Sequence, residues 1–242
     1  MSVLAIETAT EQLGVALVEE HRVVASYELL AQHPHAVELP QAVTRVLDAG
    51  GATLEQVEGI VVDIGPGSFT GLRIGMAFVK AVIFRAKKPV VGISCLDVLA
   101  GNLPLTAHLV CPIVDAKQRK VYAALYRTID GSVHKQSDYH LVTLDGLMPM
   151  LNHGPIVFLG DGVALYRERL TKQLGKRALF AAPELWLPRA ATLGRLGLER
   201  LRRGEQDDPR SLVPMYLHPM DCSIQLKQPP APSANSPSPV QG

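Results

Sequence analysis

The order of the expected strands and helices in the first hundred residues is the feature that most constrains the fold of this chain. Three short apolar runs come first, and three strands linked by tight polar turns make an antiparallel meander. The apolar spacing then changes to the helical period, and helices alternate with short buried strands. The order predicts an α/β sheet, parallel in part, with an antiparallel edge. Strands are expected at residues 3–6, 14–18, 23–30, 59–64 and 89–93, and helices at about residues 37–47 and 68–86.

A second unit begins at about residue 106 and repeats this pattern in a shorter form. Strands are expected at residues 108–114, 121–127 and 156–159, and helices at residues 144–151, 163–174 and about 193–201. We therefore predict two lobes, residues 1–105 and 106–226, each a mixed sheet with helices, of which the second is reduced. Residues 227–242 are rich in proline and serine and contain nothing that fills a core, so we expect a disordered tail there.

The composition limits which partners the chain can bind and in which cellular compartment it is expected. With 24 Lys and Arg against 23 Asp and Glu, the chain has no overall positive field, and we do not expect it to bind nucleic acid by itself. A hydrophobic fraction of 47% supports a substantial core, and a charged fraction of 19% suggests surfaces covered by another lobe or a partner. The scattered cysteines, the acidic N-terminus and the shortness of the apolar stretch at residues 76–84 predict a cytoplasmic protein without a membrane segment.

The segment DIGPGSFTGLRIG at residues 63–75 carries the strongest local signal. It follows a buried strand and opens a helix. Its glycines permit backbone angles that a side chain forbids, and its hydroxyls can cap the free amides of the helix. Such a loop presents amides and a helix dipole to an anion, but tight packing between a strand and a helix needs the same residues. Both interpretations stay open for Gly65, Pro66, Gly67, Ser68, Thr70, Gly71 and Arg73.

The same string, GPGSFTGLRIG, resembles the signature of the TsaB (YeaZ) family, and further segments match in the right order. LAIETAT at residues 4–10 resembles the family's opening strand and turn. Residues 35–40 (HAVELP), 89–96 (PVVGISCL), 115–122 (DAKQRKVY) and 212–217 (LVPMYL) resemble later family motifs. The resemblance covers about residues 2–218.

The resemblance implies an actin-like fold with two RNase H-like lobes. It also implies a role in the biosynthesis of threonylcarbamoyladenosine in tRNA. In this family the chain pairs with a homologous catalytic subunit, TsaD, and an ATPase, TsaE, joins them. The complex transfers a threonylcarbamoyl group to the adenosine beside the anticodon of ANN-reading tRNAs. We therefore expect a scaffold or activator subunit that reaches tRNA only through the complex.

The sequence indicates that this copy is not an enzyme itself. The catalytic paralogue holds a metal with two histidines spaced by three residues, whereas the corresponding residues 92–97 contain no histidine. Without imidazoles on one helical face, no transition-metal site is expected there. The closest histidines, His33 and His35, are separated by a proline and are interpreted as surface or interface residues.

Signals for nucleotide binding are weak as well. Glu7 stands where the family shows aspartate, and Asp115 begins the motif of the second lobe. These carboxylates can hold a hydrated magnesium ion between the lobes, or each can cap a turn. Gly160 and Gly162 lie in a strand-to-helix turn that can approach a ribose or phosphate. We expect no cofactor in this chain, and we expect ATP to be used by the complex rather than by this chain.

A basic turn is formed by Lys117, Arg119 and Lys120. We interpret it as a solvated turn rather than as a tRNA contact, although a shared tRNA surface is the alternative.

Apolar stripes on two helices provide the expected partner interface. In the family, the helix after the third strand and the signature helix contact the same pair in TsaD. The expected interface residues are His35, Leu39, Val43, Val46, Leu47, Leu72, Met76, Val79 and Ile83. The alternative is that these stripes cover the chain's own sheet. The signature helix is apolar nearly all round, which favours burial on two sides.

Three rival functions remain from the residues alone. A metallopeptidase needs zinc ligands that the sequence does not offer. A small-molecule kinase of the same fold needs a complete ATP cleft, and the short second lobe argues against it. A self-associating homodimer is compatible with the helical stripes, because homologous partners offer similar helices.

Overall fold

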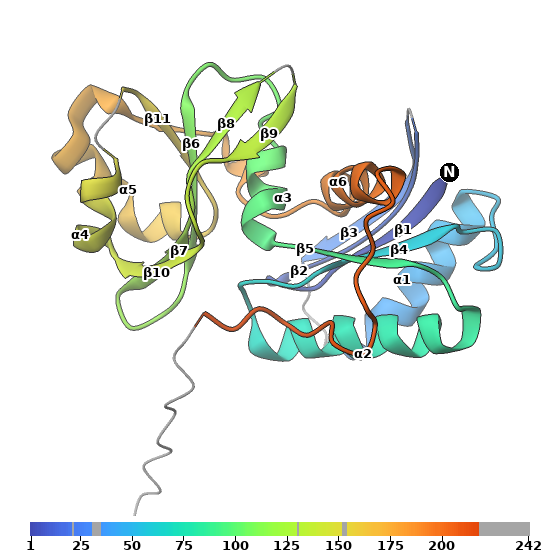
Figure 1. Ribbon diagram of the computed structural model, residues 1–242. Coiled ribbons are helices and arrows are strands. Elements are labelled where there is room, and N and C mark those ends of the chain that lie inside the picture. Colours follow the sequence, from blue (N-terminus) through green and yellow to red (C-terminus); the bar gives the residue numbers. More distant parts are fainter. Residues whose placement is uncertain (21, 31–34, 130, 152–153, 218–242) are drawn as a thin grey trace, which may run out of the picture.

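The computed structural model describes residues 1–20, 22–30, 35–129, 131–151 and 154–217, which form two lobes (Figure 1). The first lobe contains the strands β1 (Ser2–Glu7), β2 (Gln12–Glu19), β3 (Arg22–Leu30), β4 (Gly59–Asp63) and β5 (Val90–Ile93). They form one sheet with the order β3-β2-β1-β4-β5. The first three strands pair antiparallel, and β4 and β5 run parallel to β1. The predicted mixed sheet with an antiparallel edge is confirmed.

Three helices cover this sheet: α1 (His35–Ala49), α2 (Phe69–Ala86) and α6 (Ala190–Arg202). Figure 1 shows α1 and α2 on one face and α6 on the other. Successive residues of a strand point to opposite faces. Accordingly, Leu4 and Ile6 of β1 pack under α1 and α2, whereas Val3 and Ala5 pack under α6.

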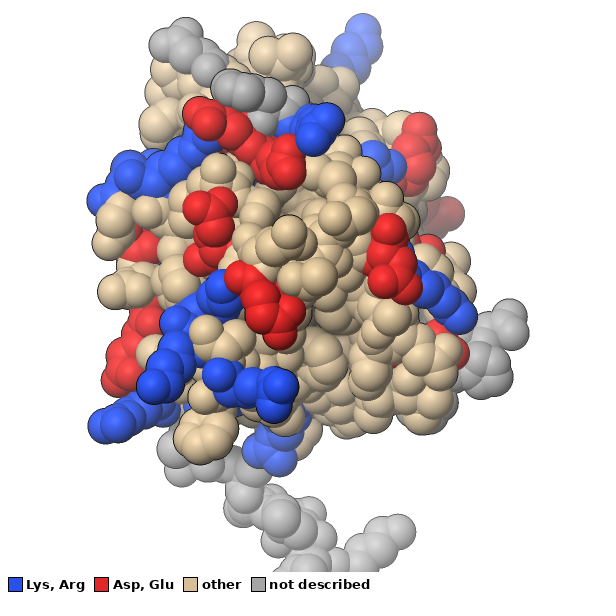
Figure 2. All heavy atoms as spheres, turned by 90° about the vertical axis from the view of Figure 1, so that its right-hand side faces the viewer, with Lys and Arg blue, Asp and Glu red and all other residues tan. Residues whose placement is uncertain are grey.

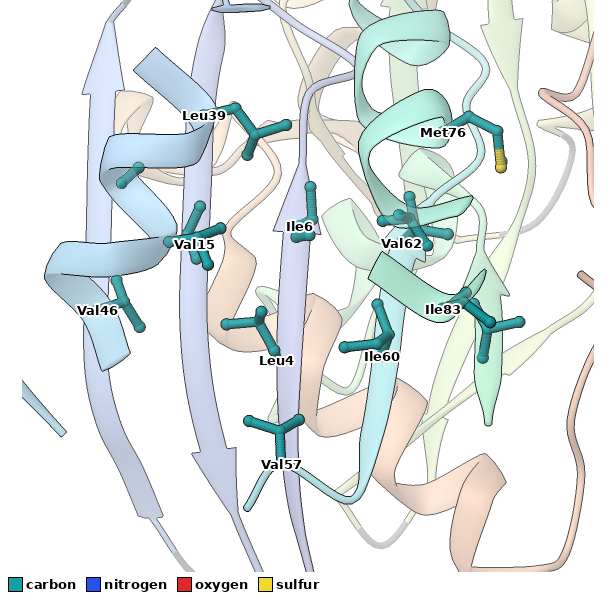
Figure 3. Close-up of a cluster of buried hydrophobic side chains, with 14 of the residues drawn as sticks. Leu4, Ile6, Val15, Leu39, Val46, Val57, Ile60, Val62, Met76 and Ile83 are labelled. Carbon is teal, nitrogen blue, oxygen red and sulfur yellow. The ribbon is translucent and has the colours of Figure 1, made fainter. Parts of the chain in front are cut away.

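Figure 3 shows the core on the α1 and α2 side of the sheet. Its labelled side chains are Leu4, Ile6, Val15, Leu39, Val46, Val57, Ile60, Val62, Met76 and Ile83, and all of them are buried. Side chains of the strands point toward those of the helices. One face of each helix is therefore buried against the chain's own sheet.

The second lobe is built on a seven-stranded sheet whose main path has the order β10-β7-β6-β11-β12, with the β8–β9 hairpin paired to β6. Its strands are β6 (Leu109–Asp115), β7 (Lys120–Ala123), β8 (Tyr126–Ile129), β9 (Ser132–Lys135), β10 (His140–Thr143), β11 (Ile156–Leu159) and β12 (Ala178–Phe180). Its helices are α4 (Leu144–Leu147) and α5 (Gly162–Leu174), with 3-10 turns η1 (Met148–Met150), η2 (Gly175–Arg177) and η3 (Pro183–Leu185). A short helix, α3 (Cys95–Gly101), contacts β6 of this lobe and α6 of the first.

The C-terminal part of the predicted second lobe belongs to the first lobe instead. We predicted a lobe that runs to residue 226, but α6 packs on β1, β2, β4 and β5. The segment after α6 stays with the same sheet, since the Asp207 amide donates to the Val90 carbonyl (2.8 Å) and the Met215 amide to the Ile64 carbonyl (2.7 Å). Gly194 and Gly197 permit this packing, because a Cβ there would overlap Val18 and Val61. The predicted tail at residues 227–242 lies outside the described residues.

Some elements differ from the sequence-based expectation. The expected strand at residues 121–127 is divided into β7 and β8, and β9, β10 and β12 were not predicted. We also missed α3, because nearly all of its residues are buried and it therefore shows no amphipathic period. Its capping signal was present: the Ser94 hydroxyl accepts a hydrogen bond from the Leu96 amide (3.2 Å). Within the described ranges, no helix has the length and apolarity needed to cross a bilayer.

Candidate functional site: the signature loop and the cleft between the lobes

The signature loop connects β4 to α2 and lies directly on the turn that follows β1. Gly65 has a positive φ of 94°, which glycine adopts without strain. A Cβ at Gly67 would overlap the Ala9 carbonyl oxygen, and one at Gly71 would overlap that of Thr8. The Ser68 amide donates to the Ala9 carbonyl (2.6 Å). Close packing of two backbones therefore explains these glycines without an anion.

The first turn of α2 is capped within the chain. The Ser68 hydroxyl accepts a hydrogen bond from the Gly71 amide (3.2 Å), and Thr70 is exposed. The guanidinium of Arg73 lies 3.8 Å from the ring centre of Phe69 and donates to the Tyr216 hydroxyl (3.3 Å). At the start of α2 these three exposed side chains form a cluster of one cation and two aromatic rings. Of the three, Arg73 was the one that the sequence analysis had predicted as a site residue.

A cleft with a volume of about 630 Å³ lies between the lobes. The signature loop and the start of α2 line one wall, and Asp115, Lys117 and Asp161 line the other. Lys117 Nζ is 2.7 Å from Asp115 Oδ2, so its charge is already neutralised by the adjacent carboxylate. Burial raises the pKa of Asp161, whose carboxylate accepts the Asp115 amide (2.9 Å). This wall combines two acidic groups with a paired lysine.

Of the four predicted nucleotide contacts, Asp115 alone lines the cleft as the structure describes it. Glu7 is fully buried, so a ligand in the cleft does not reach it. Gly160 and Gly162 do not line the cleft either. A Cβ at each would overlap the Ile113 carbonyl oxygen, so these glycines let α5 begin directly against β6. For Gly160 and Gly162 the nucleotide-contact hypothesis is corrected to a packing role, and Glu7 is corrected to a buried acid that accepts the Ala9 amide.

The basic turn between β6 and β7 has an unusual backbone. Lys117, Gln118 and Arg119 all have positive φ, at 60°, 51° and 62°. This conformation costs about 1–2 kcal/mol per residue with a side chain. The Asp115 carboxylate holds the turn by accepting the Lys117 amide (3.0 Å). Arg119 is exposed and Lys120 is half-buried, and neither lines the cleft.

The strand ends beneath the signature loop hold two buried acids. Glu7 Oε1 accepts a hydrogen bond from the Ala9 amide (2.7 Å), and Asp63 Oδ1 accepts one from the Gly65 amide (2.6 Å). Burial is the main cause that raises the pKa of both carboxyls, well above the usual range for Glu7 and to about 6 for Asp63. The sequence analysis had not singled out Asp63 as a functional residue.

A third acid joins the two lobes. The hydroxyls of Tyr126 and Tyr139 each donate to the Asp97 carboxylate at 2.7 Å. Asp97 lies on α3, whereas both tyrosines belong to the second lobe. Burial is the main cause that raises the pKa of the two phenols, which keeps them protonated as donors. Nothing in the spacing of these residues signalled the contact.

Most of the predicted interface residues point into the first lobe. Leu72 is buried in a separate cluster with side chains of α3 and the second lobe. Six others are buried in the core beneath α1 and α2: Leu39, Val43, Val46, Met76, Val79 and Ile83. Leu47 is half-buried against the same core, and His35 Nε2 bonds the Thr10 carbonyl (2.9 Å). The alternative interpretation, that these stripes cover the chain's own sheet, is correct for these side chains. A charge at Val79, which is 0% exposed, is therefore expected to unfold the protein rather than only to block a partner.

The opposite side of α2 is also apolar and is exposed. Phe84 is 90% exposed, Ala77 and Ala81 are exposed, and Ile74 and Phe78 are half-buried beside them. We call these five residues the outer stripe of α2. The outward residues of α1 are more polar and include Gln41, Thr44 and Asp48. The outer stripe was missed because an all-apolar helix does not reveal which side faces its sheet.

Basic residues follow the outer stripe at the end of α2. Arg85 and Lys87 are exposed, and Lys87 caps the helix in the left-handed conformation. Figure 2 looks at this end of the molecule and shows Lys and Arg side chains gathered at its lower left edge beside a broad uncharged area. Among the described residues, no group of three or more His, Cys, Asp or Glu side chains is arranged to hold a metal ion.

Comparison with known proteins gives consistent matches over nearly the whole chain. A family model described as TsaD, tRNA N6-adenosine threonylcarbamoyltransferase, matches residues 27–224. The tRNA threonylcarbamoyladenosine biosynthesis protein TsaB of Bacillus subtilis (strain 168) is 32% identical, covering 90% of this chain and 94% of its own. TsaB of Escherichia coli (strain K12) is 28% identical, again covering 90% of this chain and 94% of its own.

Solved structures agree with these matches. A crystal structure of a Pseudomonas aeruginosa protein, described as similar to peptidase YEAZ, superposes with a TM-score of 0.79 at 28% identity. It covers 90% of this chain and 99% of the other. YeaZ from Pseudomonas aeruginosa superposes with a TM-score of 0.76 over 89% of this chain and 99% of its own. Together with the two mixed sheets, these likenesses confirm the predicted α/β fold class, in which each lobe is a mixed sheet with helices.

Proposed function

The chain belongs to the TsaB family of tRNA threonylcarbamoyladenosine biosynthesis proteins, and we propose that it is a non-catalytic subunit that pairs with a TsaD-type transferase through the outer stripe of α2. In this proposal a TsaE-type ATPase joins the pair, and ATP and tRNA are handled by the complex, in the cytoplasm. The observation that carries the proposal is the exposed apolar surface of α2, a helix whose other side already serves the chain's own core.

The non-catalytic role is supported by how the site residues are used. The glycines of the signature loop are occupied by backbone packing, and Glu7 is buried away from the cleft. Lys117, the basic residue that lines the cleft, is paired with Asp115. Residues 92–97 end β5 and begin α3 without a histidine. The groups named here therefore have structural tasks in this chain, which supports the proposed non-catalytic role.

The outer stripe has the properties of a helix-pairing surface. Ala77 and Ala81 are small and lie at i and i+4, which lets a second helix approach closely. Phe84, almost fully exposed, offers a large apolar side chain of the kind that anchors interfaces. Arg85 and Lys87 add a basic rim at one end. We commit to a homologous TsaD-type subunit as the occupant, because the family resemblance implies pairing through the same two helices.

The test uses two substitutions that each place a glutamate at an exposed helical position. Ala81→Glu places a charge in the middle of the stripe, where pairing would remove it from water without a counter-ion. Burying such a charge costs several kcal/mol of binding free energy, so the affinity for the partner should fall by more than about a hundredfold. Thr171→Glu places a glutamate at an exposed position of α5, outside both the stripe and the cleft, and is expected to bind normally. Both variants should keep the wild-type circular dichroism spectrum.

Binding is measured by size-exclusion chromatography with light scattering, using the TsaD-type protein of the same genome. The same samples report transfer of threonylcarbamoyl from its adenylate to tRNA. The chain alone should show no transfer, and the pair should lose activity with Ala81→Glu but not with Thr171→Glu. If Ala81→Glu pairs as tightly as wild type, the proposed interface is wrong. Transfer by the purified chain alone would instead overturn the non-catalytic role.

A further inference from the structure

The two buried acids beneath the signature loop stand side by side. Glu7 ends β1 and Asp63 ends β4, and these strands are parallel neighbours in the sheet. Ile6 and Val62 are paired in the register, so the acids occupy the next rung. Their exposed fractions are 0% and 1%. Two carboxyl groups are thus held together out of water at one edge of the sheet.

One oxygen of each carboxyl is occupied by the backbone. The amides of Ala9 and Gly65, each two residues after its acid, donate to Glu7 Oε1 and Asp63 Oδ1. In the described part of the chain, the second oxygens, Glu7 Oε2 and Asp63 Oδ2, receive no N–H or hydroxyl donor. Two ionised carboxylates are acceptors only, so these two oxygens can bond each other only when one of the carboxyls carries a proton.

We propose that Glu7 and Asp63 share one proton at neutral pH, and that this carboxylic acid–carboxylate bond ties the end of β1 to the signature loop. Burial is the main cause that raises the pKa of both carboxyls, and it favours a protonated form at this site. Two unprotonated carboxylates in a buried site repel each other, and a single shared proton removes that repulsion. The two unpartnered oxygens then become each other's partners.

The charged groups that face the pair reinforce this state. Glu28 of β3 raises the pKa of Glu7, and Asp97 of α3 raises that of Asp63. The nearby thiol of Cys95 on α3 has its own pKa raised by burial and stays neutral. Burial raises the pKa of Glu28 itself, and the nearby Arg189 offsets part of that rise. The acidic neighbours make loss of the shared proton harder.

The bond connects three parts of the first lobe. Asp63 holds the Gly65 amide, and the Gly65 carbonyl accepts the Cys95 amide at the start of α3 (2.9 Å). On the other strand, Glu7 holds the Ala9 amide, and the Ala9 carbonyl accepts the Ser68 amide at the start of α2 (2.6 Å). The shared proton therefore lies between the starts of α2 and α3. If this proton is lost, the two negatively charged carboxylates repel each other at the junction that positions both helices.

The pH dependence follows from the sign of the shifts. Both folded-state pKa values lie above those of the unfolded chain, so the pair stabilises the fold at low pH and loses this contribution as pH rises toward the folded values. Above pH 6, the folded value for Asp63, unfolding should release the one shared proton. Each further pH unit, up to the pKa of that proton, should raise the unfolding constant of the wild type up to about tenfold.

Glu7→Gln is the informative variant. Its amide oxygen still accepts the Ala9 amide and its NH₂ group donates to Asp63, but it carries no titratable proton. Urea denaturation between pH 6 and pH 8 should show the wild type losing stability relative to Glu7→Gln as pH rises. Infrared spectroscopy at pH 7 should show the carbonyl stretch of a buried protonated carboxyl in the wild type and not in Glu7→Gln. The control Glu28→Gln should keep this band.

Two results overturn the proposal. One is the absence of a protonated-carboxyl band in the wild type at pH 7, a measurement that needs no variant to fold. The other is the same pH dependence of the unfolding constant in wild type and Glu7→Gln. Should Glu7→Gln fail to fold, Glu7→Asp keeps a carboxyl at this position. It is then expected to shift the band, and an unchanged band would place the protonated group elsewhere and reject the assignment.

Discussion

At the residue scale, Gly67 and Gly71 let the turn after β1 lie on the start of α2. At both positions a Cβ would meet backbone carbonyl oxygen, which cannot move aside as a flexible side chain can. The loop also places the Ser68 hydroxyl where it caps α2. The sequence of this loop resembles an anion-binding loop, but the loop packs against the turn after β1. Its glycines are required because the two backbones lie too close together for a Cβ.

Gly71→Ala tests this interpretation. The added methyl group should force the Thr8 backbone away and lower the free energy of unfolding by about 1–3 kcal/mol, the usual cost of overpacking. Gly146→Ala is the matched control, because a Cβ there meets its neighbours at an ordinary 3.5 Å and φ is not positive. The control should change stability by less than about 1 kcal/mol. Equal losses in urea denaturation of the two variants would contradict the packing role.

At the element scale, α3 connects the two lobes although it has only seven residues. It packs on β6 and on α6, and its Asp97 receives the hydroxyls of Tyr126 and Tyr139. Hydrogen bonds to a charged acceptor are stronger than neutral ones, and these are shielded from water. The helix therefore links the two lobes through both packing and hydrogen bonds.

Tyr139→Phe measures this connection. Removing the hydroxyl leaves the ring in place and should cost about 1.5–3 kcal/mol, the range for a hydrogen bond to a charged group. A double-mutant cycle with Asp97→Asn should give a coupling energy of at least about 0.5 kcal/mol, because the two side chains share one contact. Denaturation curves of the four proteins supply the cycle. Strictly additive losses would show that the bond does not connect the lobes energetically.

At the scale of the whole molecule, the chain crosses from the first lobe to the second and returns. α6 covers the face of the first sheet opposite α1 and α2, in contact with Val3, Ala5, Ala16 and Val61. The segment after it follows β5 and then reaches the signature loop through Met215. The first sheet is thus complete only when residues 190–217 are present.

Two truncated chains test whether residues 190–217, but not the tail, are needed for folding. A chain ending at Arg189 should fail to fold, since one face of the first sheet would be exposed to water. A chain ending at Lys227 should keep its melting temperature and its partner binding, because residues 228–242 contain no charged or large aromatic side chain. Circular dichroism and thermal melts compare the two. A folded chain ending at Arg189 would contradict the role given to α6.

The sequence by itself determined the elements of the first sheet, the longer helices and the family. The period of the apolar residues is a local property, so β1 to β5, α1, α2, α5 and α6 were found close to their true positions. The signature string, combined with five other segments in order, identified the family without any structure. Those conclusions need only neighbours along the chain.

Tertiary structure decided how these elements face one another. α2 is apolar on nearly every side, so only its position on the sheet separates the core residue Val79 from the exposed Phe84. α6 has the same amphipathic pattern whichever sheet it covers, and contacts alone place it on the first. Glu7 and Asp63 are 56 residues apart and meet because their strands are parallel neighbours. Spacing along a chain sets local conformation, whereas burial and pairing depend on what the fold brings together.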